Sequence, residues 1–356
     1  MAGIIVYHAV EHFDVFTQEP VAFTLPCDGV AGSVLSWLLS GKMYGIFAML
    51  FGLSFFIMKE RHRGSRPFAL WFAWRMCLLF LFGLVDVAFY DGDILMLYAV
   101  YGLLLIPVGY LPSPMVWCII GVLAIQPVEL FCLLTHTSVD HSRLFDIYGQ
   151  TLALHEHGTF WENAANNLRY GFELNLRYNI FSGRLTQLLC LFILGMQLGR
   201  HHLFHNSGRN LRIWHGISAF SAAIVVALSF ADLGVLKPWL MPVYNLCVMI
   251  MIVAAVVSLW YASTGVRGVL HHLCIFGRMS LTHYLLQSVI GCFVFYGYGL
   301  ACYRLVGTTY AALIGMAMVA VQYVFCRYWF RDGVGGKGHQ RGPLEGLWRR
   351  MTNWAS

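Results

Sequence analysis

Charged side chains are scarce in this sequence of 356 residues. Lys, Arg, Asp and Glu together make up 11% of it, hydrophobic residues make up 59%, and the mean hydropathy is +0.66. Soluble domains are typically about a quarter charged. A soluble chain of this length could not cover its surface with so few charges, so the excess apolar surface must face lipid. We therefore expect a membrane protein.

Two further features are missing from the sequence. No run of Lys and Arg is interleaved with aromatic residues, so we expect no nucleic-acid partner despite the net charge of +6. No two of the ten cysteines are spaced as Cys-x-x-Cys, and most lie inside apolar runs, where Cys packs as a small hydrophobic residue. The histidine clusters at 155–157 and 201–205 lack cysteine partners. We interpret them as solvated loop residues and expect no metal site.

Long apolar runs, by contrast, are abundant. A helix needs about 20 mostly apolar residues to cross a bilayer. The candidate spans cover residues 37–58, 68–90, 94–110, 115–135, 185–198, 213–233, 238–261, 281–300 and 308–328. Residues 2–10 are apolar but too few to cross, and we interpret them as the outer half of a first helix whose beginning is missing, or alternatively as a short re-entrant helix. The sequence thus predicts an all-α, polytopic transmembrane helix bundle of about ten spans, the first truncated, in one domain over residues 1–356.

The basic residues predict how this bundle is oriented. If the loop 59–67 is cytoplasmic and the spans alternate from there, most Lys and Arg residues fall on the cytoplasmic side, as the positive-inside rule requires. The tail 329–356 is then cytoplasmic, and so is the N-terminus if the first helix is complete. The polar segment 136–184 becomes an extracytoplasmic loop, in which we expect helical stretches along the membrane interface.

The string HAVEHFD at residues 8–14 is the most informative group of ionisable residues. On a helix, Glu11 and His12 follow His8 by three and four positions, so all three share one face. A neutral imidazole can take a proton from an attacking hydroxyl or amine, and a carboxylate on its other nitrogen fixes its tautomer. Glu11 is placed to do this for His8. The alternative interpretation is that both histidines anchor the helix at the membrane interface.

Other charged residues are expected within or beside the spans, where ionisable groups are costly and mark functional sites by default. We predict that Lys42 and Asp93 pair across the outer half of the membrane, a structural role that can also shape a site. Glu129 lies near the same outer side. Arg75 lies inside its span, where it can either extend its side chain to the interface or reach a phosphate or thioester from within the bundle.

Four strings recur in order and spacing in a known family. SGKMYGIFAMLFGLSFF, WRMCLLFLFGLVDVAFYDGDILMLYAVYGLLL, GRMSLTHYLLQS and GPLEGLWRR together resemble the YeiB-like bacterial family, domain of unknown function 418, over nearly the whole chain. That family is grouped with the transmembrane acyltransferase superfamily, whose relatives acetylate sugars or glycans with acyl-CoA. Such proteins usually begin with an Arg-containing LD-x-LRG string, which this chain lacks.

The resemblance also assigns residues to the family's motifs. His8 falls where the acyltransferase relatives place a histidine at the end of the first helix. Lys42 is the lysine of the Gly-Lys pair, Arg75 is the arginine of the third span, and Asp93 is the acid of GDIL. Within GRMSLTHYLLQS the matching residues are Arg278, Tyr284 and Gln287, and in the tail motif they are Glu345 and Arg349.

Together these features predict an acyltransferase of the bacterial cytoplasmic (inner) membrane. It would move an acyl group, such as acetyl, from cytoplasmic acyl-CoA to an extracytoplasmic glycan or similar acceptor, without a metal. His8, or failing that His12, would be the general base, with Glu11 orienting it. The acyl-CoA contacts would come from Arg75, Arg278, Gln287 and Tyr284, and the acceptor would be positioned by Lys42, Asp93 and Glu129.

Two other classes of function remain open. In a permease or a flippase for a lipid-linked intermediate, the same buried charges would form a translocation route. A non-enzymatic membrane scaffold is the third class, and association with further copies of the chain is left open. Transporters often carry internal repeats with broken helices at matching positions, and we find none in the sequence, which favours the enzyme.

Overall fold

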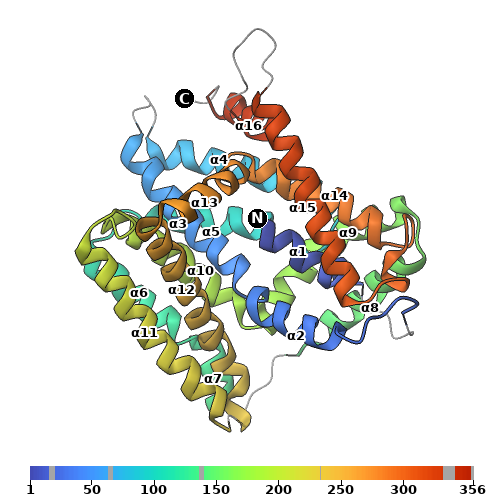
Figure 1. Ribbon diagram of the computed structural model, residues 1–356, viewed down its shortest axis with the longest axis horizontal. Coiled ribbons are helices and arrows are strands. Elements are labelled where there is room, and N and C mark those ends of the chain that lie inside the picture. The colour runs from blue at the N-terminus through green and yellow to red at the C-terminus, as the bar shows by residue number, and fades with distance from the viewer. Residues whose placement is uncertain (16–20, 63–66, 136–139, 233, 332–340, 354–356) are drawn as a thin grey trace.

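The computed structural model describes residues 1–15, 21–62, 67–135, 140–232, 234–331 and 341–353. These ranges hold helices and no named strand, which confirms the all-α class (Figure 1). In chain order the elements are α1 (Ala2–Val10), η1 (His12–Asp14), α2 (Asp28–Leu39), α3 (Met43–Arg61), α4 (Phe68–Val87), α5 (Leu95–Val108), α6 (Ser113–Ala124), α7 (Pro127–Thr135), α8 (Ser142–His157), α9 (Phe160–Phe181), α10 (Arg184–Arg200), α11 (Gly208–Phe230), η2 (Gly234–Leu236), α12 (Lys237–Ala262), α13 (Thr264–Gly277), α14 (Ser280–Phe295), η3 (Cys302–Arg304), α15 (Thr308–Arg331) and α16 (Pro343–Asn353).

Five described helical segments are long and apolar enough to cross a membrane: α2 with α3, α4, α11, α12 and α15. The bent pairs α6–α7 and α9–α10 raise the number to seven if each pair is one span. Each predicted span overlaps a helix, or two helices for 37–58 and 115–135, but the count of ten is not confirmed. The reason is length, since α5 has 14 residues and rises only about 21 Å, less than a bilayer core.

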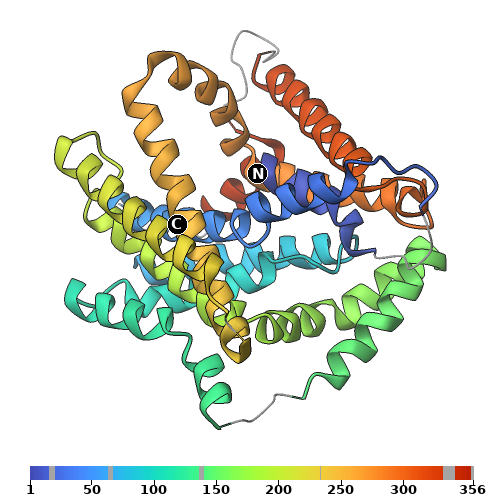
Figure 2. The ribbon, with the colours of Figure 1, turned by 60° about the horizontal axis from the view of Figure 1, so that its bottom comes forward.

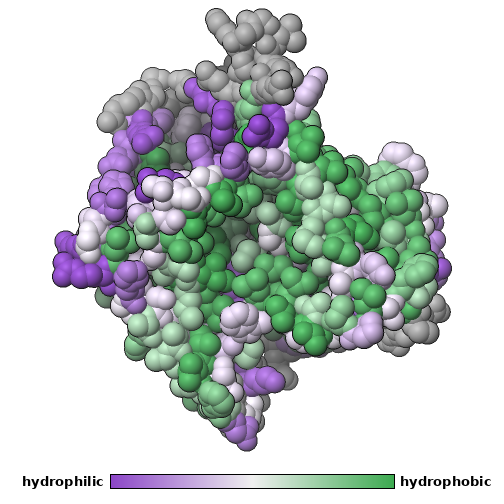
Figure 3. Space-filling model, viewed as in Figure 1, coloured by the Kyte–Doolittle hydropathy of each residue, from purple (hydrophilic) through white to green (hydrophobic). Residues whose placement is uncertain are grey.

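The surface of the bundle is apolar over a broad face. Figure 3 shows hydrophobic residues across the face that α2, α12 and α15 form, and hydrophilic residues at the end of the bundle where α3 ends and α16 lies. Phe220 of α11 and Val321 and Val324 of α15 are each more than 60% exposed. An apolar belt with polar ends is what a lipid-embedded bundle requires. The chain is a helical membrane protein.

Helices α3 and α10 touch through two glycines. A Cβ atom on Gly52 of α3 would lie 1.8 Å from the carbonyl oxygen of Phe192, and a Cβ atom on Gly195 of α10 would lie 1.8 Å from that of Met49. The two backbones are therefore in direct contact. Membrane helices associate in this way because small residues allow the close packing that lipid does not otherwise drive.

The tail helix α16 is docked on the bundle. The Glu345 carboxylate accepts hydrogen bonds from the backbone N–H groups of Leu281 (2.7 Å) and Thr282 (3.0 Å) and from the Thr282 hydroxyl (2.7 Å). Both residues belong to the first turn of α14, whose N–H groups have no partner within the helix. Two distant sequence motifs, GRMSLTHYLLQS and GPLEGLWRR, thus meet as a helix start and its cap.

The segment expected outside the membrane folds into α8 and α9, which pack together beside the bundle (Figure 2). Arg143 of α8 and Arg177 of α9 both donate to the carboxylate of Glu173, at 2.6 and 2.8 Å. The helical stretch predicted in this loop is confirmed as α9. Helix α9 ends at Phe181, and Ser182 and Gly183 join it to α10 at a bend of 88°.

Candidate functional site

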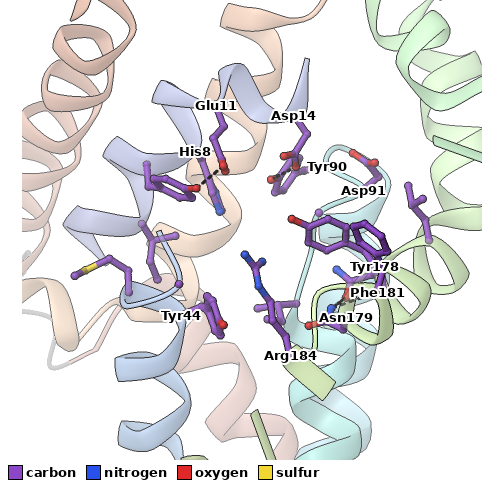
Figure 4. A pocket seen from close by; sticks show the side chains of 18 of the residues that line it. His8, Glu11, Asp14, Tyr44, Tyr90, Asp91, Tyr178, Asn179, Phe181 and Arg184 are labelled. Carbon is purple, nitrogen blue, oxygen red and sulfur yellow. Dashed lines mark hydrogen bonds between the residues drawn. The ribbon is translucent and has the colours of Figure 1, made fainter. Parts of the chain in front are cut away.

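A cavity of about 270 Å³ lies where α1, the start of α3, the 88–94 loop, α8, α9 and the start of α10 converge (Figure 4). Aromatic side chains dominate its wall, among them Tyr7, Tyr44, Tyr90, Tyr148, Tyr178 and Phe181. The ionisable side chains that line it are His8, Glu11, Asp14, Asp91 and Arg184. An apolar cavity with a few convergent polar groups is the usual form of a small-molecule site.

A strained turn after α1 carries Asp14 into this cavity. His12, Phe13 and Asp14 all adopt left-handed backbone conformations, with φ of 50°, 53° and 67°, which cost about 1–3 kcal/mol each for residues other than glycine. The turn is held by Phe13, which is fully buried, and whose ring lies so close to Gly291 that a Cβ atom there would be 1.9 Å away. Strain that the surroundings enforce in this way is typical of functional sites.

The cavity acids each have a partner of their own. The Tyr7 hydroxyl donates to Glu11, and the Tyr90 hydroxyl donates to Asp14 at 2.5 Å. Asp91 lies 3.6 Å from Nε2 of His155. The prediction that residues 155–157 are solvated is therefore wrong for His155, which is 1% exposed and stacks on a tyrosine ring. The sequence did not indicate the burial of His155, since His157, two residues further along, is exposed.

Burial sets the protonation of the ionisable side chains around Asp91. Desolvation, and then the charge of Asp91, raises the pKa of Asp14 to about 6. Desolvation likewise raises the pKa of Asp91 to about 6 and lowers the pKa of His155 to about 4. In each case the charged form is disfavoured because it would lose water without a full replacement.

Of the predicted site residues, His8, Glu11 and Tyr284 line the cavity. The His8 ring packs against the rings of Phe13 and Tyr90, at centroid distances of 5.6 and 5.2 Å, and its Nδ1 has no described hydrogen-bond partner. The predicted bond between Glu11 and His8 is not formed, since Glu11 is bound by Tyr7. His12 points elsewhere, with Nε2 3.0 Å from the carbonyl oxygen of Val306.

The residues expected to position the acceptor lie behind the cavity wall. Lys42 and Asp93 are buried, but no described ion pair joins them. Asp93 instead accepts from the backbone N–H groups of Leu95 and Met96 at the start of α5. Glu129 lies at the α9–α10 bend, where Thr186 donates to it at 3.4 Å. Sequence position did not predict toward which neighbours these side chains point.

Most of the residues expected to bind acyl-CoA lie away from this cavity. The Arg75 guanidinium stacks between Trp71 and Trp348, 5.0 and 4.2 Å from their ring centroids. Gln287 is fully buried, and its amide has no described hydrogen-bond partner. Arg278 lines a second cavity of about 440 Å³ between α13 and α15.

This second cavity is basic. Its described lining includes His271, His272, Arg278 and Arg327 and no acidic residue. In contrast, no group of three or more His, Cys, Asp or Glu side chains suited to a metal ion occurs among the described residues.

The sequence interpretation missed Arg184 and the tyrosines of the first cavity. Arg184 looks like one of several cations in a polar segment, and a tyrosine near a helix end looks like an interface anchor. Gly183, directly before an apolar helix, could have indicated this position of Arg184. A glycine there permits the left-handed turn (φ 67°) from which Arg184 enters the cavity.

The comparisons place the chain among proteins without a described activity. The matching family is described as a protein of unknown function (DUF418), and its match covers residues 198–355. YxaH of Bacillus subtilis is 28% identical, over 91% of this chain and 82% of that protein, and YeiB of Escherichia coli is 24% identical, over 92% and 86%. A 39.9 kDa protein of Bacillus acidopullulyticus is 25% identical, over 91% and 84%. All three are named as uncharacterized, and no solved structure matches the chain.

Proposed function

We propose that this chain, which belongs to the YeiB-like DUF418 family, is a membrane-embedded acyltransferase of the bacterial inner membrane. It moves an acyl group from acyl-CoA to a hydroxyl or amine of an extracytoplasmic glycan or similar acceptor. The observation that carries the proposal is His8, whose imidazole lines the first cavity and whose Nδ1 has no described hydrogen-bond partner. Such an imidazole is available to take a proton from an acceptor.

The chemistry needs only a base and an activated donor. His8 accepts the proton of the acceptor's O–H or N–H group as that oxygen or nitrogen attacks the thioester carbonyl. The C–S bond then breaks, and the departing CoA thiolate takes up a proton from the histidine. Glu11 binds the Tyr7 hydroxyl and so fixes a second polar group on the same wall.

The basic cavity between α13 and α15 supplies a site for the donor's phosphates. Arg278 and Arg327 are exposed there beside two histidines, an arrangement suited to phosphate oxygens. Helices α14 and α15 contact each other and carry buried polar side chains. His283 Nε2 lies 2.8 Å from Sγ of Cys326, and the amides of Gln287 and Gln322 have no described partner.

The same buried amides favour the second candidate function, a permease or flippase. Unpaired polar groups inside a membrane bundle mark a hydrated route as well as a ligand channel. The two functions differ in whether a covalent bond is broken.

Release of free thiol from acyl-CoA by the purified protein in lipid nanodiscs separates them. We expect thiol release that depends on added acceptor and is matched by an equal amount of acylated product. Absence of thiol release over a range of sugar acceptors, together with uptake of the sugar into proteoliposomes, would favour the carrier.

A further inference from the structure

Arg184 is a partly buried cation on the wall of the first cavity. It begins α10 directly after the left-handed Gly183, and its guanidinium lies 4.9 Å from the ring centroid of Tyr44 and 5.3 Å from that of Tyr178. In Figure 4 it points into the open space of the cavity, toward the wall that carries His8. No described carboxylate lies within ion-pair distance of it.

None of the described carboxylates around the cavity forms an ion pair with this cation. Tyr7 donates to Glu11, Tyr90 donates to Asp14, and His155 lies beside Asp91. These acids lie on the turn that follows α1 and on the 88–94 loop, whereas Arg184 enters from the opposite side in Figure 4. The acids and the cation are therefore held apart across the cavity.

A guanidinium removed from water is costly unless an anion replaces the lost hydration. Its planar fork matches the paired oxygens of a carboxylate or phosphate, and such charge-assisted hydrogen bonds are among the strongest in proteins. The tyrosines beside it offer flat faces and hydroxyls to the rest of a ligand. A cavity built in this way selects an anion with a polar, ring-shaped body.

We propose that Arg184 binds a carboxylate or phosphate group of the acceptor, so that the acceptor is an acidic sugar or sugar phosphate whose reactive hydroxyl or amine reaches His8. The identification of this ligand as the acceptor rests on the proposed acyl transfer. The anion site itself does not, because it follows from the geometry of Arg184.

Direct binding tests the proposal without any catalytic step. Isothermal titration of the full-length protein in nanodiscs would use glucuronate, glucose 1-phosphate and uncharged glucose as probes. We expect at least one of the two anions to bind about tenfold or more tightly than glucose. Binding of that anion should be weakened about tenfold or more in Arg184→Gln and should survive in His8→Ala.

Two further variants keep the result interpretable. Arg184→Lys keeps the charge but not the fork, so it should bind the anion with intermediate affinity even if Arg184→Gln fails to fold. Arg177→Gln, which removes a surface arginine bound to Glu173, is the matched control and should bind as the wild type does. The anion site is refuted if neither anion binds better than glucose, or if Arg184→Gln binds like the wild type. If anion binding depends on Arg184 but no thiol is released, the result supports the anion site and contradicts the proposed acyl transfer.

Discussion

Single side chains in the first cavity differ in how their charges are compensated. Asp14 receives a hydrogen bond from Tyr90, and the loss of solvation on the cavity wall raises its pKa to about 6. Its folded-state pKa therefore lies above the ordinary value of 3.8. The stability that follows from the bound proton is fully present below about pH 4 and is lost as the pH rises through about 6.

Asp14→Asn should remove this pH dependence. The Asn side-chain oxygen still accepts from Tyr90, but no buried carboxylate needs to ionise. At pH 8 the variant should be more stable, by on the order of 3 kcal/mol, because a shift of about two pKa units is worth roughly that much. At pH 4 the two proteins should unfold at similar temperatures. Thermal unfolding at both pH values checks this, and a variant that is less stable at pH 8 would show that the charge is needed.

The two arginines expected to bind acyl-CoA should behave differently when changed. Arg278 lines the basic cavity, so Arg278→Gln should weaken CoA binding several-fold, and added salt should weaken the wild-type interaction because exposed charges are screened. Arg75 stacks on Trp348 of the tail helix, so Arg75→Gln should lower the unfolding temperature and leave CoA affinity unchanged. Equilibrium binding of CoA at two salt concentrations distinguishes the two variants. Loss of CoA affinity in Arg75→Gln but not in Arg278→Gln would mean that Arg75 contacts the phosphates.

At the scale of helices, the bundle depends on close backbone contacts. Gly195→Ala places a methyl group where the Met49 carbonyl already lies, so α3 and α10 must separate. We expect a loss of about 1–3 kcal/mol, the usual cost of overpacking. Gly121→Ala on α6 is the matched control, because a Cβ atom there would meet nothing within 4 Å. Thermal unfolding of both variants measures the difference, and equal stability would mean that the helices adjust freely.

The positions of the helices could be predicted from the sequence, whereas the partners of their polar side chains could not. Long apolar runs had to become helices because lipid offers no partner for an unpaired backbone group, and each predicted span is helical. The spacing predicted one shared face for His8, Glu11 and His12, and of these His8 and Glu11 line the cavity. The partner of Glu11 could not be derived, because Tyr7 lies one turn before it and competes for the same carboxylate. The Lys42–Asp93 pair failed for a similar reason, since backbone N–H groups at the start of α5 already occupy Asp93.

At the scale of the whole molecule, the two cavities would serve the two sides of the membrane. The tail helix lies at the polar end of the bundle where α3 ends, and α8 borders the first cavity away from it (Figures 1 and 3). We predict that the end of the bundle that carries the tail helix is cytoplasmic and that α8 is extracytoplasmic. On a cysteine-free background, an impermeant maleimide added to intact spheroplasts should label Ser142→Cys and not Arg350→Cys. The reverse labelling would invert the proposed donor and acceptor sides.

The most direct test of the account compares two histidines four residues apart. His8 lines the cavity, whereas His12 contacts the Val306 carbonyl outside it. Acceptor-dependent thiol release from acyl-CoA should fall by about 10²–10⁴-fold in His8→Ala, the usual contribution of a general base, with CoA binding intact. His12→Ala, the matched control, should stay within a few-fold of the wild type. Wild-type rates in His8→Ala, with the protein folded and CoA bound, would contradict the proposed role of the cavity as the site of acyl transfer.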